Sequence, residues 1–262
     1  MAMKIGPMGA GRTAISTADA DSVTVRGRDL CGELMGGRSF TEFFLLALLG
    51  REPTEDQRFF VDAMLIAIAE HGLTPSVQAA RMTLAAGPEA FQGAVAASVL
   101  GCGSVILGSS DAAGAFLADG VAEARAAGEA VEVAARRLAV RQHAAGRPLP
   151  GFGHPLHKPV DPRAERLIDL ARQRGVVGDH TRLALALRDC VAEVWGKPLP
   201  LNVSGAIPAI LLDLDFPLGA MKGIPILARV AGTIAHLNEE TARPIGFRLA
   251  HAAARDIDYD GG

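Results

Sequence analysis

The chain has 262 residues, of which 49% are hydrophobic and 21% are charged, a composition ordinary for a soluble globular enzyme of one or two domains. Its formal net charge of −3 provides no basic field for nucleic acid or an anionic membrane, so a few local cations must hold any anionic ligand. Three widely spaced cysteines favour reduced thiols over disulfides or a zinc site. Residues 1–12 lack the apolar core of a signal peptide, and the apolar runs are short, so we expect a soluble, cytoplasmic protein.

Helical periodicity dominates the sequence, and no hairpin dipeptide is flanked by clean alternation of apolar and polar residues. After one helical segment, His71 and Gly72 with Pro75 just beyond form a C-terminal stop signal. The sequence therefore predicts an all-α fold. The expected helices cover residues 41–49, 55–70, 90–107, 112–145, 163–174, 181–195, 205–213 and 224–240.

The last of these helices combines an apolar stripe with two basic side chains on its flank. Arg229 and His236 are seven positions apart, which places them on the same side of the helix. The apolar stripe consists of Ile226, Leu227, Val230, Ile234 and Leu237.

The stretch from Gly146 to Pro162 contains three clusters of glycine or proline and cannot be regular helix. Two glycines bracket Phe152, so the backbone there can bend tightly or approach a ligand. His154 follows on this irregular loop, a position typical of a working side chain presented by a scaffold. Arg163 opens the next helix and offers a planar donor fork for a carboxylate.

Two other interpretations of this stretch stay open. It is equally a proline-rich connection with Asp161 as a helix cap and with Lys158 and Arg163 as solvated charges. His154 and His157 also form a candidate metal pair, although the intervening proline prevents helical geometry and no third ligand is nearby in sequence.

The run from Gly151 to Arg163 resembles the signature loop of citrate synthases and of the related citryl-CoA lyases. Further segments resemble the family in the same order and cover about residues 23–250. They are Val25–Leu30 with Phe43–Gly50 and Pro53-Thr54, then Glu70-His71-Gly72, Leu201–Gly205, Ala228–Gly232 and Arg243-Pro244.

The resemblance implies a citrate synthase-like, all-α architecture of two helical domains. A large domain would comprise about residues 1–109 and 211–262, and a smaller domain of about residues 110–210 would carry the His154 loop. The family architecture also implies a homodimer or dimer of dimers, with sites between domains and subunits.

The same resemblance assigns roles to individual side chains. His71 would bind a carboxylate or carbonyl of the acid substrate, and the preceding helix C-terminus would favour its imidazolium form. His154 would hydrogen-bond the oxaloacetate carbonyl or the citryl hydroxyl. The carboxylate clamps would be Arg163, Arg229 and Arg243, the last reaching in from the partner subunit. Asn202 would contact the acid, and coenzyme A would meet Lys158, Gly151, Phe152 and Gly153.

Two positions depart from the family pattern. Synthases carry a histidine that stabilises the acetyl-CoA enolate, and Leu107 stands there in this chain. Citryl-CoA lyases, including the lyase module of ATP-citrate lyases, also lack that histidine, so the match favours a lyase. The family's catalytic aspartate is Ser204 here, and a serine hydroxyl cannot act unassisted as a general base. A nucleophilic Ser204 is disfavoured, since no Gly-x-Ser-x-Gly motif surrounds it.

The resemblance therefore implies carbon–carbon bond cleavage or formation between acetyl-CoA and oxaloacetate, with citryl-CoA cleavage as the preferred direction. The expected partners are a coenzyme A thioester and a di- or tricarboxylic acid, with no metal or redox cofactor, nucleic acid or membrane. One alternative is an enzyme for another acyl-CoA and 2-oxo acid. Another is a non-catalytic protein that binds coenzyme A esters. Asp213 or Asp215, one helix further on, is a candidate replacement for the missing aspartate.

Overall fold

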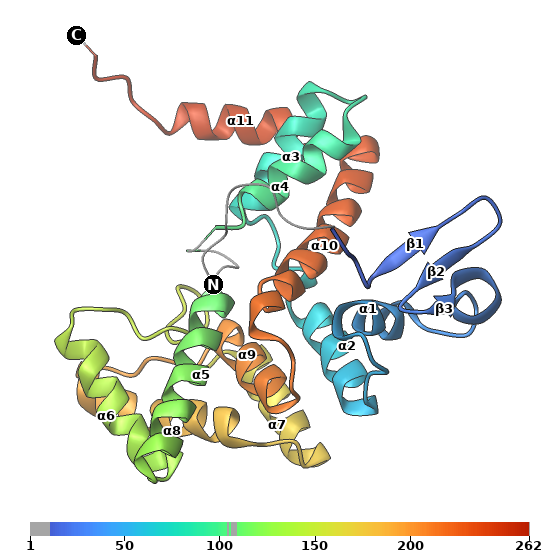
Figure 1. Ribbon diagram of the computed structural model, residues 1–262. Coiled ribbons are helices and arrows are strands. Elements are labelled where there is room, and N and C mark those ends of the chain that lie inside the picture. The colour runs from blue at the N-terminus through green and yellow to red at the C-terminus, as the bar shows by residue number, and fades with distance from the viewer. Residues whose placement is uncertain (1–10, 104, 106–108, 262) are drawn as a thin grey trace. The chain divides into compact units, whose positions relative to one another are not determined.

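The computed structural model describes residues 11–103, 105 and 109–261, and the chain divides into two compact units, Met1–Arg58 and Phe59–Gly262. Helices dominate the fold, which confirms the all-α prediction (Figure 1). These two units do not coincide with the large and small domains expected from the resemblance, and that domain division stays a prediction.

The first unit contains a small antiparallel sheet that the sequence pattern did not reveal. Its strands are β1 (Ser16–Ala18), β2 (Val23–Val25) and β3 (Arg28–Asp29), in the order β1-β2-β3. Arg26 and Gly27 join the last two strands, and both have positive φ (52° and 80°), as in the tight hairpin turns that suit twisted strands. A π-helical turn (Leu30–Leu34) and helix α1 (Phe40–Leu49) complete this unit, with Val25, Leu34 and Leu46 in its core.

The second unit holds two groups of packed helices joined by loops. Helix α2 starts at Glu55, in the first unit, and continues beyond Phe59 into the second. The helices are α2 (Glu55–Ala69), α3 (Pro75–Ala86), α4 (Phe91–Leu100), α5 (Ser109–Ala127), α6 (Val131–Ala144), α7 (Pro162–Arg174), α8 (Asp179–Trp195), α9 (Val203–Asp213), a 3-10 turn (Leu218–Ala220), α10 (Gly223–Ala242) and α11 (Gly246–Arg255).

In one group, α5, α6, α8 and α9 enclose a shared apolar core, and α7 packs on α9. In the other, α3, α4 and α10 pack around Ala80, Leu84, Ala94 and Leu237, and α11 packs on α3.

Several helices differ from the sequence-based expectation. Pro75 is the first residue of α3 as well as a stop for the helix before it, because a proline at the first helical position lacks only a hydrogen bond that is absent there anyway. Gly128 (φ 67°) splits the expected helix 112–145 into α5 and α6. The expected helix 90–107 ends at Leu100, and α11 was not expected.

The segment Leu218–Ala242 is long and apolar enough to span a membrane by length and composition alone. In this structure α10 packs on α3 and α4, and its buried face includes the polar side chains of Arg229, Thr233 and Glu240. This buried face differs from the apolar stripe recognised in the sequence, because Ile234 of that stripe is 46% exposed. We interpret α10 as a core helix that brings Arg229 inside the unit.

Candidate functional site

The second unit contains a cavity of about 550 Å³. Its walls come from the end of α2, the loop before α7, the first turns of α7 and α9, and α10. The structure thereby brings together residues that are far apart in the sequence. The predicted site residues in its lining are His71, Gly151, Phe152, Gly153, His154, Arg163, Asn202, Ser204 and Arg229.

His71 follows the C-terminal end of α2, in a segment held against α10. Gly232 lies on the buried face of α10 at the point where a Cβ would be only 2.1 Å from the carbonyl oxygen of Ala69, so a glycine is needed there. Glu70 accepts a hydrogen bond from His236 Nε2 at 2.9 Å if that nitrogen carries the proton. These contacts hold the residues on the N-terminal side of His71 against the helix that carries Arg229.

The His154 loop is joined to the segment that precedes α9. Gly153 donates its backbone N–H to the carbonyl of Pro200 (2.8 Å), and Asn202 Nδ2 donates to the carbonyl of Gly153 (2.7 Å). At Gly151 (φ 82°) an added Cβ would be 2.7 Å from the Cα of Gly205, so the loop lies directly on α9. Because Asn202 also caps α9 through Gly205, its side chain holds the loop and the helix start together.

The backbone of the same loop determines the proton position on His154. Its Nδ1 accepts hydrogen bonds from the N–H groups of Leu156 (3.1 Å) and His157 (2.9 Å). A ring nitrogen that accepts carries no proton, so the neutral imidazole carries its proton on Nε2. Arg163 Nη2 lies 3.4 Å from this Nε2 and could donate to it only in the other tautomer, because a guanidinium does not accept. The two shorter backbone bonds to Nδ1 outweigh that long contact, so the Nε2–H form is the favoured one and Arg163 is a second donor beside it. Together they form a site for a substrate oxygen.

Arg163 is held by the carboxylate of Asp161. Its Nε and Nη2 donate to the two oxygens of Asp161 at 3.0 Å and 2.9 Å. Asp161 is completely buried and also accepts from the backbone N–H of Val203 at 3.0 Å. The sequence suggested only a cap for α7; Asp161 additionally links Arg163 to the first residue of α9.

Arg229 is the most unusual group of the cavity. The residue is only 3% exposed, and neither Nε nor Nη1 has a hydrogen-bond partner within the described residues. An unpaired buried guanidinium is unfavourable by itself, because burial removes its hydration. The arrangement is therefore suited to an anion that enters the cavity and takes both donors.

Ser204 lies in the first turn of α9, at the wall of the cavity. No aspartate or glutamate lines the cavity among the described residues. Asp213 accepts hydrogen bonds from the backbone N–H groups of Gly178, His180 and Thr181, and the exposed Asp215 follows it. Neither lines the cavity, so the structure does not support either as a replacement for the missing carboxylate.

Both cavity-lining histidines are poor cations. Burial, followed by the nearby Arg163, His157 and Arg229, lowers the pKa of His71, and Asp161 offsets this only in part. Burial and then His157 lower the pKa of His154. The expected imidazolium form of His71 is therefore wrong: desolvation and neighbouring cations outweigh the partial charge of the helix end.

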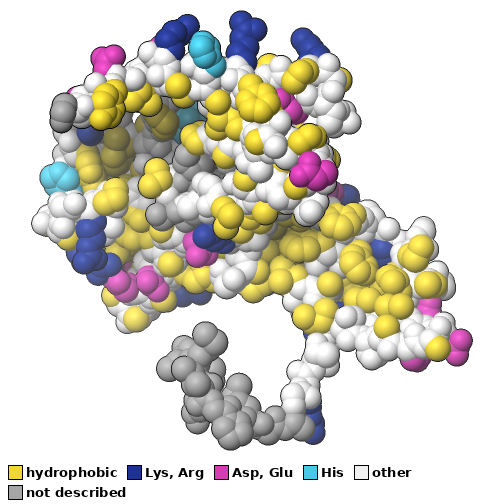
Figure 2. Space-filling view, turned by 90° about the horizontal axis from the view of Figure 1, so that it is seen from above, with side chains coloured by type: hydrophobic (Ala, Val, Ile, Leu, Met, Phe, Trp, Pro, Cys, Tyr) yellow, Lys and Arg dark blue, Asp and Glu magenta, His cyan; other side chains and the backbone are white. Residues whose placement is uncertain are grey.

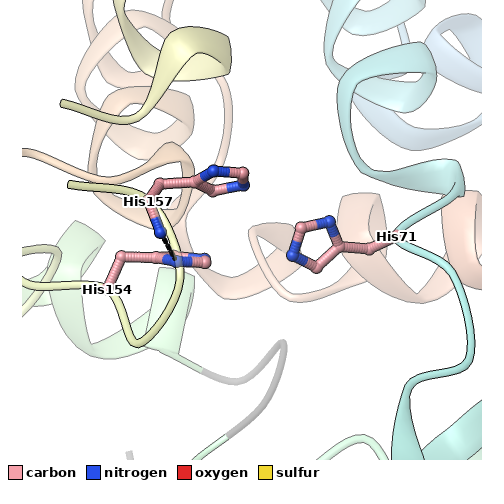
Figure 3. A group of neighbouring side chains, drawn as sticks. All are labelled: His71, His154 and His157. Carbon is pink, nitrogen blue, oxygen red and sulfur yellow. Dashed lines mark hydrogen bonds between the residues drawn. The ribbon is translucent and has the colours of Figure 1, made fainter.

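His71, His154 and His157 form a cluster whose potential ligand atoms lie within 4.8 Å of one another (Figure 3). The third ligand that the sequence lacked is thus His71. A metal-bound imidazole normally donates through its other nitrogen, whereas His154 Nδ1 accepts two N–H groups. The Nε2 proton and the adjacent guanidinium of Arg163 also oppose a cation, so this cluster fits neutral imidazoles better than a metal.

Two predicted site residues lie outside the cavity lining. Lys158 is exposed, and the Arg243 side chain is 81% exposed, 3.5 Å from Glu239. Their roles toward coenzyme A and the partner subunit stay predictions. Leu107 lies outside the described residues. On the face seen in Figure 2, cationic and anionic side chains are interspersed among hydrophobic ones, without a continuous basic surface.

The chain is similar in sequence and fold to known proteins. The chain matches the family model for the citrate synthase C-terminal domain over residues 9–248. The citrate synthase of Synechocystis sp. is 29% identical over 202 residues, which are 75% of this chain and 48% of that protein. The chain spans about half the length of the curated relatives that it matches.

Two solved structures are similar in fold. Citryl-CoA lyase from Hydrogenobacter thermophilus has a TM-score of 0.84 and 34% identity, over 96% of this chain and 95% of that one. ATP citrate lyase from Methanothrix soehngenii, in complex with citrate and coenzyme A, has a TM-score of 0.80 at 22% identity, over 98% of this chain and 43% of that one.

Proposed function

Because the chain belongs to the citrate synthase family, we propose that it cleaves citryl-CoA to acetyl-CoA and oxaloacetate. One observation carries the proposal: the unpaired, buried Arg229 shares a cavity with the proton-bearing Nε2 of His154. The first group needs an anion, and the second offers a donor to a hydroxyl or carbonyl oxygen. The 34% identity to a citryl-CoA lyase over nearly the whole of both chains supports the lyase direction.

In this proposal the acid end of citryl-CoA binds to the two arginines. Arg229 takes one carboxylate in its buried fork, and Arg163, already oriented by Asp161, takes a second group with the donors that remain. His154 Nε2–H points to the tertiary oxygen and stabilises the carbonyl that forms as the carbon–carbon bond breaks. The reverse condensation uses the same contacts.

The remaining assignments concern coenzyme A and a second copy of the chain. Coenzyme A would lie along Gly151–Gly153, with the exposed Lys158 at a phosphate. Arg243, which lies outside the cavity of its own chain, would complete the site of a second copy in a homodimer. No metal or redox group is required by these steps.

Turnover of synthetic citryl-CoA tests the proposal, with acetyl-CoA and oxaloacetate measured as products. We expect His154→Ala to abolish turnover while calorimetry shows coenzyme A binding largely intact, because His154 acts at the acid end. His251→Ala is the matched control, since His251 is exposed on α11. Equal activity in His154→Ala and the parent protein would remove His154 from the mechanism.

A second candidate is a non-catalytic protein that binds coenzyme A esters. It is favoured by the lack of a carboxylate among the described residues that line the cavity. Tight binding of citryl-CoA without products would support it. Turnover of a different acyl-CoA with a different 2-oxo acid, in a panel of such pairs, would instead support a related enzyme with Ser204 as a recognition group.

A further inference from the structure

Cleavage of citryl-CoA requires a group that accepts the proton of the tertiary hydroxyl. Among the described residues that line the cavity, the ionisable side chains are two histidines and two arginines, with no carboxylate, lysine, tyrosine or cysteine. An arginine does not give up its proton in proteins, so it cannot become a base. The choice therefore lies between His71 and His154.

The hydrogen bonds of His154 exclude it from this role. Its Nδ1 is occupied by the N–H groups of Leu156 and His157, which places the proton on Nε2. An imidazole in this state donates a hydrogen bond through Nε2 and has no open lone pair toward the cavity. In the other tautomer the lone pair of Nε2 would face the Arg163 guanidinium at 3.4 Å, so neither form leaves an open lone pair. His154 can polarise the substrate oxygen, but it cannot remove the proton.

His71 meets the requirement. Within the described residues no hydrogen bond occupies either of its ring nitrogens, and the residue lines the cavity. Figure 3 shows His71 facing the His154–His157 pair from another part of the chain. The ring centroids of His71 and His154 are 5.8 Å apart in a T-shaped arrangement, and both residues line the same cavity.

We propose that His71 is the general base of this site and takes the place of the absent carboxylate. The inference rests on the proposed lyase function and assigns the proton transfer within it. The hydroxyl O–H bond breaks, and its proton moves to a ring nitrogen of neutral His71. The carbon–carbon bond then breaks, its electron pair forms the acetyl-CoA enolate, and the oxaloacetate carbonyl forms against His154 Nε2–H. The imidazolium of His71 returns the proton to the enolate carbon, which gives acetyl-CoA and regenerates the base.

The charges around His71 agree with this cycle. The groups that face it are Arg163 and Asp161 from the start of α7, His157 from the loop, and Arg229 from α10. Their net effect, with burial, lowers the pKa of His71, so the free protein holds it as a neutral base at pH 7. Bound substrate carboxylates oppose these cations and strengthen the base when it is needed.

His157 is the remaining imidazole of the cluster. Its Nε2 is buried without a hydrogen-bond partner within the described residues, and it does not line the cavity. Its ring stacks on His154 at a centroid distance of 4.4 Å. It is thus a neighbour of the base with no direct access to the substrate, which makes it the matched control inside the same cluster.

The test compares His71→Gln with His157→Gln in citryl-CoA cleavage. Glutamine retains an N–H donor for a carboxylate or carbonyl, but it cannot accept a proton. We expect kcat of His71→Gln to fall by about 10²–10⁴-fold with little change in KM, and added imidazole to restore part of the kcat of His71→Ala. The parent activity should fall as pH drops through the pKa of His71. The residual activity of His71→Gln should not show this decline at low pH.

The possible outcomes separate the inference from the proposed function. A parent protein that does not cleave citryl-CoA overturns the proposed function. An active parent whose His71→Gln variant keeps kcat but loses affinity overturns the inference alone, since His71 then binds a carboxylate. A His157→Ala variant that loses kcat and regains it with imidazole, while imidazole does not rescue His71→Ala, would also overturn it.

Discussion

Asp161 accepts a hydrogen bond from the backbone N–H of Val203 at 3.0 Å and so joins the end of the His154 loop to the first residue of α9. The same carboxylate orients Arg163 through two further bonds. A single buried side chain therefore sets the position of one substrate-facing cation relative to the helix turn that carries Ser204. This link leads to the first two predictions.

Asp161→Asn should lower the free energy of unfolding by about 3–5 kcal/mol, because it leaves Arg163 without its buried counter-charge. Urea denaturation would measure the loss. Glu193→Gln is the control, since the Glu193–Arg136 pair is exposed and such pairs contribute about 1 kcal/mol or less. Similar losses in both variants would contradict the assigned role of Asp161.

The stability of the parent protein should also depend on Asp161 at low pH. Burial alone would raise the pKa of Asp161, but hydrogen bonds from Arg163 and Val203 and the charge of Arg163 lower it overall. A carboxyl whose pKa is depressed in the folded state contributes stability above its unfolded pKa of about 3.9, and this is lost as pH falls through the folded pKa. The free energy of unfolding should therefore be measured from about pH 5 downward, through the unfolded and folded pKa of Asp161. It should decline less in Asp161→Asn than in the parent.

Arg229→Met should weaken binding of the acid substrate by about 30-fold or more, because truncating one partner of a buried charge pair typically removes at least about 2 kcal/mol. The same change should raise the melting temperature of the free protein, since it removes an unpaired buried charge. Calorimetry with oxaloacetate or citrate measures the change in affinity, and thermal melts measure the change in stability. Arg248→Met, at an exposed position on α11, is the control, and unchanged affinity in Arg229→Met would rule out the proposed clamp.

Ser204→Asp should raise citryl-CoA cleavage by up to about 10²-fold, because it places a carboxylate base at the cavity wall. The first turn of α9 also favours an anion electrostatically. In the His71→Gln background the same change should restore turnover, since the carboxylate then accepts the proton. Melting curves must show that both variants fold, and a folded double variant without recovered turnover would show that a carboxylate in place of Ser204 cannot accept the proton.

Mixing two inactive variants tests the shared site expected of a homodimer. Arg243→Ala and His154→Ala chains should regain some activity when mixed, because one hybrid site then contains both native residues. The exposure of Arg243 in its own chain is consistent with this arrangement. Absence of rescue after demonstrated subunit exchange would place Arg243 outside the site.

Local sequence patterns were enough to locate most helices and the functional loop. Glycine and proline between Gly146 and Pro162 exclude helix for steric reasons, and this is the segment that presents His154. The same local rules failed at two places for different reasons. Pro75 ends one segment and starts α3, and Arg26-Gly27 is not among the usual hairpin dipeptides.

The identity of the residues in the cavity was also accessible from the sequence, because the resemblance to the family places His71, His154, Arg163 and Arg229 in order. Asp161 was visible only as a helix cap. Its bond to Val203 connects residues 42 positions apart, and no local pattern reports such a contact. The unpaired state of Arg229 likewise follows from which groups do not reach it after folding.

The sequence by itself determined most of the helical elements and which side chains are available, because periodicity and backbone sterics act over a few residues. Only the tertiary structure decided their protonation. Two backbone N–H groups set the proton of His154 on Nε2, and burial with cations from α7, the loop and α10 keeps His71 neutral. Hydration and Coulomb interactions depend on distance in space, so the assignment of donor and base emerges only when these segments are brought together.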